Sequence, residues 1–130
     1  MKRVLIVDGD EESRQTWERE LKVAGAEVDF LSEGNEALRR LENGGADLVV
    51  TDVHLPDISG LHFITEVHRK DSLLPVIVIT GDNSWDMSRR IRTEGGPVFY
   101  YGLKPIEIRE LEWVIEAALS WRQSRKTYWG

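Results

Sequence analysis

Three short runs of this chain are almost wholly apolar, and an acid or a hydroxyl residue follows each of them. They span residues 4–7, 48–51 and 76–79, are rich in Val and Ile, and have Thr51 as their only polar member. A strand that is apolar along its length has both faces buried, which is typical of a parallel sheet covered by helices on both sides. Residues 98–101 form a fourth such run, whereas residues 26–30 alternate as a half-exposed edge strand does.

Amphipathic segments separate these runs and predict helices. Trp17, Leu21 and Ala24 recur at helical spacing before a stop at Gly25, and Ser84 is suited to begin a helix as its N-cap. Further helices are predicted over residues 34–41, after residue 60, and from about residue 107 to 121. Strand and helix alternate five times, so the sequence predicts an α/β fold with helices on both faces of a parallel sheet.

The length of the chain suits one domain. We place this domain at residues 1–121 of the 130 residues. Residues 122–130 are basic and lack a helical stripe. They are predicted to be either a C-terminal tail or the start of a linker to an output domain.

Composition disfavours several functional classes. The formal net charge is −6, which is not typical of a DNA-binding surface, so no direct nucleic-acid binding is expected. The chain has no Cys, which excludes thiol catalysis and thiolate metal sites. Only four consecutive apolar residues precede Asp8, and no run reaches the ~18 residues of a membrane span. The chain is therefore predicted to be soluble, cytoplasmic and without membrane contact.

Chemically active side chains follow four of the predicted strands. Asp8 and Asp10 follow residues 4–7, Asp52 follows residues 48–51, Thr80 follows residues 76–79 and Lys104 follows residues 98–101. Because open α/β sheets bind ligands at the carboxyl ends of their strands, these groups are expected to converge. Crowded carboxylates suit a Mg²⁺ ion, and a carboxylate can attack phosphorus to form an aspartyl phosphate. An ammonium group can then neutralise charge on the transferring phosphoryl oxygens.

The order and spacing of these motifs resemble the receiver domains of two-component response regulators over about residues 3–120. The matching stretches are residues 4–8, 47–60 with Pro56 and Gly60 at familiar offsets from the acid, 75–81, and 103–106 with its Lys-Pro pair. The resemblance implies a doubly wound, flavodoxin-like, five-stranded parallel sheet in the order 2-1-3-4-5. It also favours a cis peptide bond before Pro105.

For the acids, the resemblance implies that Asp52 is the phosphoacceptor. It implies that Asp8, Asp52 and the backbone carbonyl of His54 hold Mg²⁺. The sequence departs from the family at Gly9, where most receivers carry a second acid. Asp10 is either the substitute ligand, bound directly or through water, or a helix cap. The alternative is a degenerate pseudo-receiver, which binds partners without phosphorylation.

For the phosphoryl group, the resemblance implies three further roles. Lys104 contacts the phosphoryl oxygens, Thr80 hydrogen-bonds the phosphoryl group, and Tyr101 rotates inward to follow it. Two residues are expected at the rim of the site. There, His54 tunes the lifetime of the phosphoryl group, and Asp82 occupies a similar position.

The resemblance also implies partners, with a sensor histidine kinase or a phosphotransfer protein as phosphoryl donor. The signal is expected to leave through the face of the fourth helix, fifth strand and fifth helix, toward a second copy or an output partner. Trp85, Trp113 and Trp121 suggest a partner or dimer surface on that face, and the alternative is that Trp113 and Trp121 pack against the body or the tail. An aspartyl-phosphate hydrolase is disfavoured because position 54 is His, and a flavin or nucleotide protein because no Gly-rich loop follows the first strand. The chain is predicted to be a signalling module and not an enzyme.

Overall fold

The computed structural model describes the backbone of residues 1–129 and the side chains of residues 1–125. Strands and helices alternate along the chain. The strands are β1 (Lys2–Val7), β2 (Ala26–Leu31), β3 (Leu48–Thr51), β4 (Val76–Thr80) and β5 (Tyr100–Leu103). The helices are α1 (Glu11–Glu20), α2 (Gly34–Leu41), α3 (Gly60–Lys70), α4 (Trp85–Glu94) and α5 (Ile108–Trp129).

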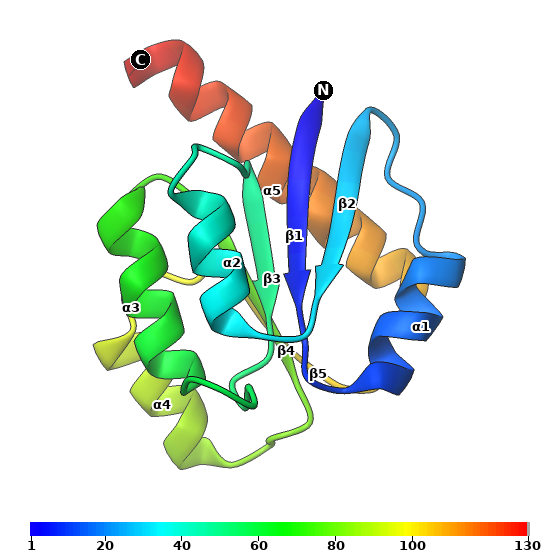
Figure 1. Cartoon of the computed structure of the whole chain (residues 1–130), viewed down its shortest axis with the longest axis vertical. Coiled ribbons are helices and arrows are strands. Elements are labelled where there is room, and N and C mark those ends of the chain that lie inside the picture. Colours follow the sequence, from blue (N-terminus) through cyan, green and yellow to red (C-terminus); the bar gives the residue numbers. More distant parts are fainter. Residues whose placement is uncertain (130) are drawn as a thin grey trace.

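The strands of the described chain form one parallel sheet in the order β2-β1-β3-β4-β5 (Figure 1), which confirms the predicted fold. The register places Val4 of β1 between Val28 of β2 and Leu48 of β3. Because all strands run the same way, their carboxyl ends share one edge, the lower edge in Figure 1. β2 is an edge strand with partly exposed residues, as its alternating pattern predicts.

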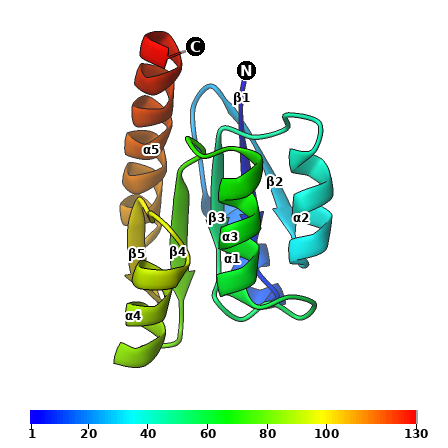
Figure 2. The same cartoon turned by 90° about the vertical axis from the view of Figure 1, so that its left-hand side faces the viewer.

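Helices cover both faces of the sheet, and Figure 2 shows α5 on one side with α2 and α3 on the other. Alternate residues of each central strand enter two separate cores. Val49 packs in the core beneath α2, α3 and α4, whereas Leu48 and Val50 pack in the core beneath α1 and α5. This two-sided burial is the reason why the central strands are apolar along their length.

Two helix ends differ from the sequence prediction. α1 ends at Glu20, because Leu21 is extended and the next backbone N–H, that of Lys22, donates to the Glu112 carboxylate on α5. α5 continues past residue 121 to Trp129. The prediction that this helix ends at residue 121 is wrong, and Arg122 is buried within it and forms a two-pronged ion pair with Asp71. Whether residues 122–130 lead to an output domain stays a prediction.

The last strand begins two residues later than its apolar run predicts. Val98 and Phe99 precede β5, and the first paired residue is Tyr100, opposite Ile77. Phe99 instead packs against the ring of Trp121, with 6.3 Å between the centroids. The apolar character of Val98 and Phe99 therefore reflects packing at the amino edge of the sheet.

Candidate functional site

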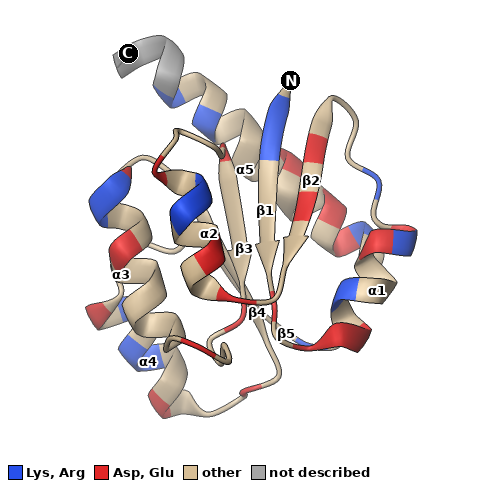
Figure 3. Cartoon of the chain, viewed as in Figure 1, with Lys and Arg blue, Asp and Glu red and all other residues tan. Residues whose placement is uncertain are grey.

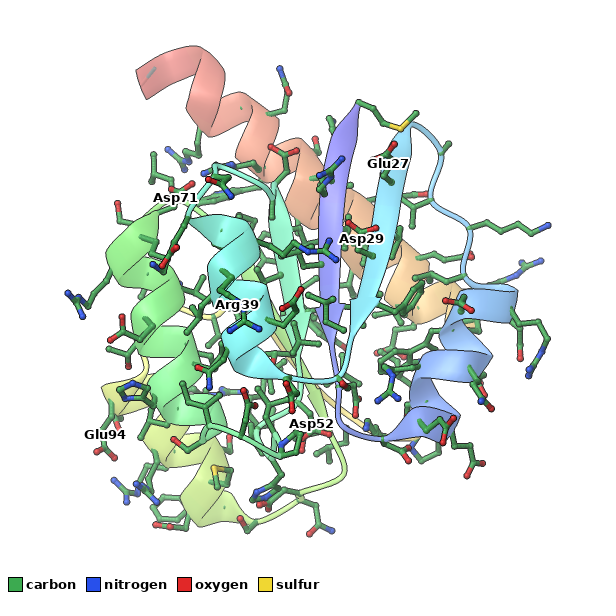
Figure 4. All side chains as sticks on the ribbon, in the orientation of Figure 1. Glu27, Asp29, Arg39, Asp52, Asp71 and Glu94 are labelled. Atoms are coloured by element: carbon green, nitrogen blue, oxygen red, sulfur yellow. The ribbon has the colours of Figure 1, made fainter. Side chains whose placement is uncertain are left out.

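Four residues predicted to form the site meet at the carboxyl edge of the sheet. Asp8 follows β1, Asp52 follows β3, Thr80 ends β4 and Lys104 follows β5. Acidic residues, red in Figure 3, mark the loops along this edge, and Figure 4 places Asp52 there. Asp8, Asp52 and Thr80 are buried although they are polar, so each needs a partner inside the protein.

Lys104 provides the positive charge that the two buried acids require. Its Nζ atom lies 2.7 Å from Asp8 Oδ2 and 3.0 Å from Asp52 Oδ2. Burial raises the pKa of Asp8, and the opposing effect of Lys104 does not cancel this rise. Burial alone would lower the pKa of Lys104, but its hydrogen bonds to the two carboxylates outweigh burial and leave that pKa raised.

The other oxygen of Asp52 is held by two donors. The Thr80 hydroxyl donates to Asp52 Oδ1 at 2.6 Å, and the backbone N–H of His54 donates to the same atom at 3.1 Å. With Lys104 on Oδ2, three groups from three loops or strands fix the orientation of this carboxylate. These hydrogen bonds and the ion pair fix the direction of the Asp52 oxygens and stabilise the carboxylate as an anion.

Thr80 also connects the site to the start of α4. Its hydroxyl oxygen accepts a hydrogen bond from the backbone N–H of Asp82 at 3.2 Å, and the Asp82 carboxylate accepts one from the backbone N–H of Ser84 at 2.9 Å. Ser84 is the N-cap of α4, as predicted, and accepts from the Met87 backbone. A continuous chain of hydrogen bonds therefore runs from Asp52 to the first turn of α4.

His54 and Asp82 meet across the mouth of the site. His54 Nε2 lies 2.7 Å from Asp82 Oδ2, although the two residues come from different loops. Hydrogen bonds from Ser84, followed by the one from His54, lower the pKa of Asp82 to about 2. Both residues had been predicted at the rim, but their contact with each other had not, because no local pattern predicts a pair separated by 28 residues.

Tyr101 lies on β5 with its hydroxyl oxygen buried and without a hydrogen-bond partner among the described residues. The Arg92 guanidinium of α4 lies over its ring, 5.4 Å from the centroid. Burial, together with the nearby Asp82 charge, raises the pKa of the Tyr101 hydroxyl. Tyr101 thus joins α4 to β5, beside the loop that carries Asp82.

Asp10 lies near this cluster, but its carboxylate has another role. It caps α1, accepting hydrogen bonds from the Ser13 backbone N–H at 3.2 Å and the Ser13 hydroxyl at 2.7 Å. These bonds, from the hydroxyl first, lower the pKa of Asp10. Its backbone N–H donates to Asp8 Oδ1 at 2.8 Å. The helix-cap alternative therefore describes the Asp10 carboxylate in this structure.

The cluster fits a cation shared by two carboxylates. The Lys104 ammonium already stands within 3.0 Å of both Asp8 and Asp52, so it marks a position from which one positive charge reaches both. Across the described side chains, no group of three or more His, Cys, Asp or Glu residues is placed to hold a metal. Two carboxylates still suit Mg²⁺, which binds one or two of them and keeps several waters.

The loop after β3 shows why a Gly is needed at a fixed distance after Asp52. A Cβ atom on Gly60 would lie 2.5 Å from the Val53 backbone, and the Gly60 N–H donates to the Val53 carbonyl at 2.9 Å. Ser59 caps α3 and forms an isolated antiparallel bridge with His54. Gly60 therefore lets the loop fold back, which brings the His54 N–H to Asp52.

The structure also bears on the predictions for the Lys104–Pro105 bond and for the tryptophans. The Lys104–Pro105 bond is cis, as favoured. Trp85 and Trp113 are 77% and 72% exposed, so they are available on the surface, whereas Trp121 packs on Phe99. No sequence pattern indicated a site role for Trp17, whose ring lies beside Lys104. Its position in an amphipathic pattern indicated only the core.

Comparison with known proteins agrees with this geometry. Residues 4–116 match the family described as the response regulator receiver domain, and the chain belongs to that family. It is 30% identical over 123 residues to the DNA-binding transcriptional regulator NtrC of Salmonella typhimurium, covering 95% of this chain and 26% of that protein. It is 34% identical over 125 residues to the transcriptional regulatory protein PrrA of Mycobacterium bovis, covering 96% and 53%.

Solved structures give the same result. A CheY-like response regulator receiver domain protein from Methanospirillum hungatei superposes with a TM-score of 0.85 at 28% identity, covering 96% of this chain and 98% of that one. The signal receiver domain of an HD domain-containing protein from Pseudomonas fluorescens gives 0.86 at 26% identity, covering 95% and 98%. The chain spans about a quarter to a half of the curated relatives named above.

The family assignment defines a class of protein. The chain is a receiver domain of two-component response regulators, which is a signalling module and not an enzyme of the usual kind. None of the helices in the described chain is both long and apolar enough to span a bilayer.

Proposed function

We propose that the chain receives a phosphoryl group on Asp52 and uses it to alter the surface formed by α4, β5 and α5. The observation that carries this proposal is the environment of the Asp52 carboxylate. It is buried, yet it is held by the Thr80 hydroxyl, the His54 N–H and the Lys104 ammonium. A carboxylate with so many donors is oriented for attack and is surrounded by groups that suit phosphoryl oxygens.

The transfer is a displacement at phosphorus. An oxygen of Asp52 forms a bond to the phosphorus of a phosphohistidine, the P–N bond breaks, and the leaving imidazole nitrogen keeps the electron pair and takes up a proton. A sensor histidine kinase or a phosphotransfer protein is the donor that this chemistry requires. Lys104 neutralises charge on the transferred oxygens, for which its contact with Asp52 places it well.

Mg²⁺ is the cofactor that we propose for this site. Asp8, Asp52 and the backbone carbonyl of His54 would hold it, and Asp10 would contribute only through water because its carboxylate caps α1. When bound, the ion supplies neutralising charge to the phosphoryl oxygens. Gly9 leaves the site one acid short of most receivers, so Mg²⁺ affinity is expected to be lower here.

The signal would then pass along the hydrogen bonds already present. Once the phosphoryl group is attached, its oxygens attract the Thr80 hydroxyl, which is now bonded to Asp52 and to the Asp82 N–H. Moving Thr80 disturbs Asp82, and with it the capping of α4 at Ser84. Tyr101 follows the change from β5, so a partner or a second copy at the α4-β5-α5 surface can respond.

The test is the intact mass of the protein after incubation with a small-molecule phosphodonor, with and without Mg²⁺. We expect one added phosphoryl group that depends on Mg²⁺ and is absent in Asp52→Asn. No added mass in a protein shown to be folded would overturn the proposal. The pseudo-receiver alternative, for which Gly9 is the supporting observation, would then take its place.

A further inference from the structure

Lys104 has a third neighbour besides the two carboxylates. Its ammonium nitrogen lies 5.8 Å from the centroid of the Trp17 ring, within the range in which a cation interacts with an aromatic face. Both residues border an open groove between α1 and the loop after β5. The ammonium is therefore bounded by charge on one side and by an aromatic ring on another.

Trp17 is well fixed in the structure. It is 5% exposed and is the only buried residue of α1 in the described structure, so it is the main apolar anchor of that helix. Its ring packs in the same core as Leu111 and Ile115 of α5. A lysine side chain has four rotatable bonds and loses much conformational freedom when it is held, so a fixed neighbour reduces the number of positions it can adopt.

The carboxylates alone cannot hold Lys104 in one position throughout the reaction. A phosphoryl group on Asp52 changes the charge at one of the two partners, and a cation bound at Asp8 and Asp52 would compete with the ammonium for both. The Trp17 ring carries no formal charge and belongs to the core, so its attraction for the ammonium is the same before and after transfer.

From this geometry we propose that Trp17 is a positioning residue, which holds the Lys104 ammonium beside Asp8 and Asp52 and keeps it ready for the phosphoryl oxygens. The effect on phosphoryl transfer rests on the proposed function of Asp52, but the contact itself does not. Trp17 touches neither Asp52 nor the phosphorus, and acts only through Lys104.

The contact can be tested in the protein without donor or metal. The chain has five lysines, so ε-¹³C-lysine labelling gives few signals, and Lys104→Gln identifies the one of interest. We expect the Lys104 ε-protons to be shifted upfield by the Trp17 ring relative to the other four lysines. The shift should disappear in Trp17→Leu and persist, reduced, in Trp17→Phe. A Lys104 signal that is unchanged by Trp17→Leu would overturn the contact.

The role can be tested by the rate of phosphoryl uptake from a small-molecule donor. Trp17→Leu is expected to slow uptake about two- to fivefold, the factor that an ordinary cation–π contact corresponds to, and Trp17→Phe is expected to recover most of the loss. Leu119→Ala, which removes apolar volume from the same core, controls for a general loss of packing and should leave the rate unchanged. Equal rates for the wild type and Trp17→Leu would overturn the role.

A double-mutant cycle separates positioning from structural damage. In a Lys104→Gln background, Trp17→Leu should cause no further slowing, because the group that it positions is gone. The same slowing in both backgrounds would show a structural effect and overturn the proposal. If the wild type takes up no phosphoryl group, the proposed function fails instead, and the lysine spectra still decide whether the contact exists.

Discussion

Replacing Lys104 with Met leaves two buried carboxylates without their shared cation, and this change is expected to destabilise the fold. At 2.7 and 3.0 Å, Coulomb's law with an effective dielectric constant of about 20 gives roughly 6 kcal/mol of attraction for each pair. Desolvation of the three groups and repulsion between the acids offset most of this sum. Removing one partner of a buried ion pair typically costs about 3–5 kcal/mol. Because the Lys104 side chain is 19% exposed, we expect the lower end, about 3 kcal/mol.

The assay is urea unfolding followed by far-ultraviolet circular dichroism in the presence of EDTA. Asp52→Asn is the matched control, since its amide oxygen can still accept from Thr80 and His54 while the Asp8–Lys104 pair remains. We expect this control to lie within about 1 kcal/mol of the wild type. Adding Mg²⁺ should restore more stability to Lys104→Met than to the wild type, because the ion replaces the missing charge.

The loss of stability in Lys104→Met should depend on the charges of Asp8 and Asp52. If crowding of the acids causes the loss, Lys104→Met should cost little in a protein that already carries Asp8→Asn and Asp52→Asn. A loss below about 1 kcal/mol from Lys104→Met alone, or the same loss when it is added to the Asp8→Asn, Asp52→Asn protein, would contradict this electrostatic explanation. The second result would indicate that the aliphatic part of Lys104, and not its charge, stabilises the site.

Three further predictions concern the neighbouring residues. Burial raises the pKa of Asp8 above 3.8, so the ionised carboxylate destabilises the folded state at pH 7. Asp8→Asn should therefore unfold at a higher urea concentration than the wild type at pH 7, and this difference should shrink as the pH falls toward 3.8. Gly9→Asp should lower the Mg²⁺ concentration for half-maximal phosphoryl uptake by roughly tenfold, whereas Gly9→Ala, which adds only a Cβ 3.0 Å from Pro56, should not. Thr80→Val should lose about 1 kcal/mol of unfolding free energy in urea, because the hydrogen bond to Asp52 is gone. It should still take up a phosphoryl group, but uptake should not shift the α4 amide resonances, whereas in Thr80→Ser it should.

The sheet and most of the site could be predicted from the sequence because both depend on local patterns. Val76–Ile79 is apolar throughout because it is buried on both faces, and this is visible in the residues alone. Parallel strands bring their carboxyl ends to one edge, so Asp52 and Lys104 could be placed together without knowing any side-chain geometry.

What the sequence could not predict depends on contacts between distant residues. Arg122 is polar and suggested the end of a helix, but its pairing with Asp71, 51 residues away, allows burial and lets α5 continue. Leu21 continues the helical spacing of Trp17, yet the chain leaves the helix there and the next residue bonds to Glu112. Trp17 could be assigned to the core, but its position beside Lys104 depends on how α1 packs against the loop after β5.

The length of α5 has a mechanical consequence. At 1.5 Å per residue, the 22 residues of the helix form a rod about 33 Å long. Its first turn follows Lys104 and Pro105 at one edge of the sheet, and Arg122 fastens it to Asp71 at the opposite edge, where Figure 4 labels Asp71. A tilt of about 5° at the end beside Lys104 would move the far end by about 3 Å if the rod turned as a whole. The Arg122–Asp71 ion pair ties the helix to the loop after α3, so it would oppose such a tilt.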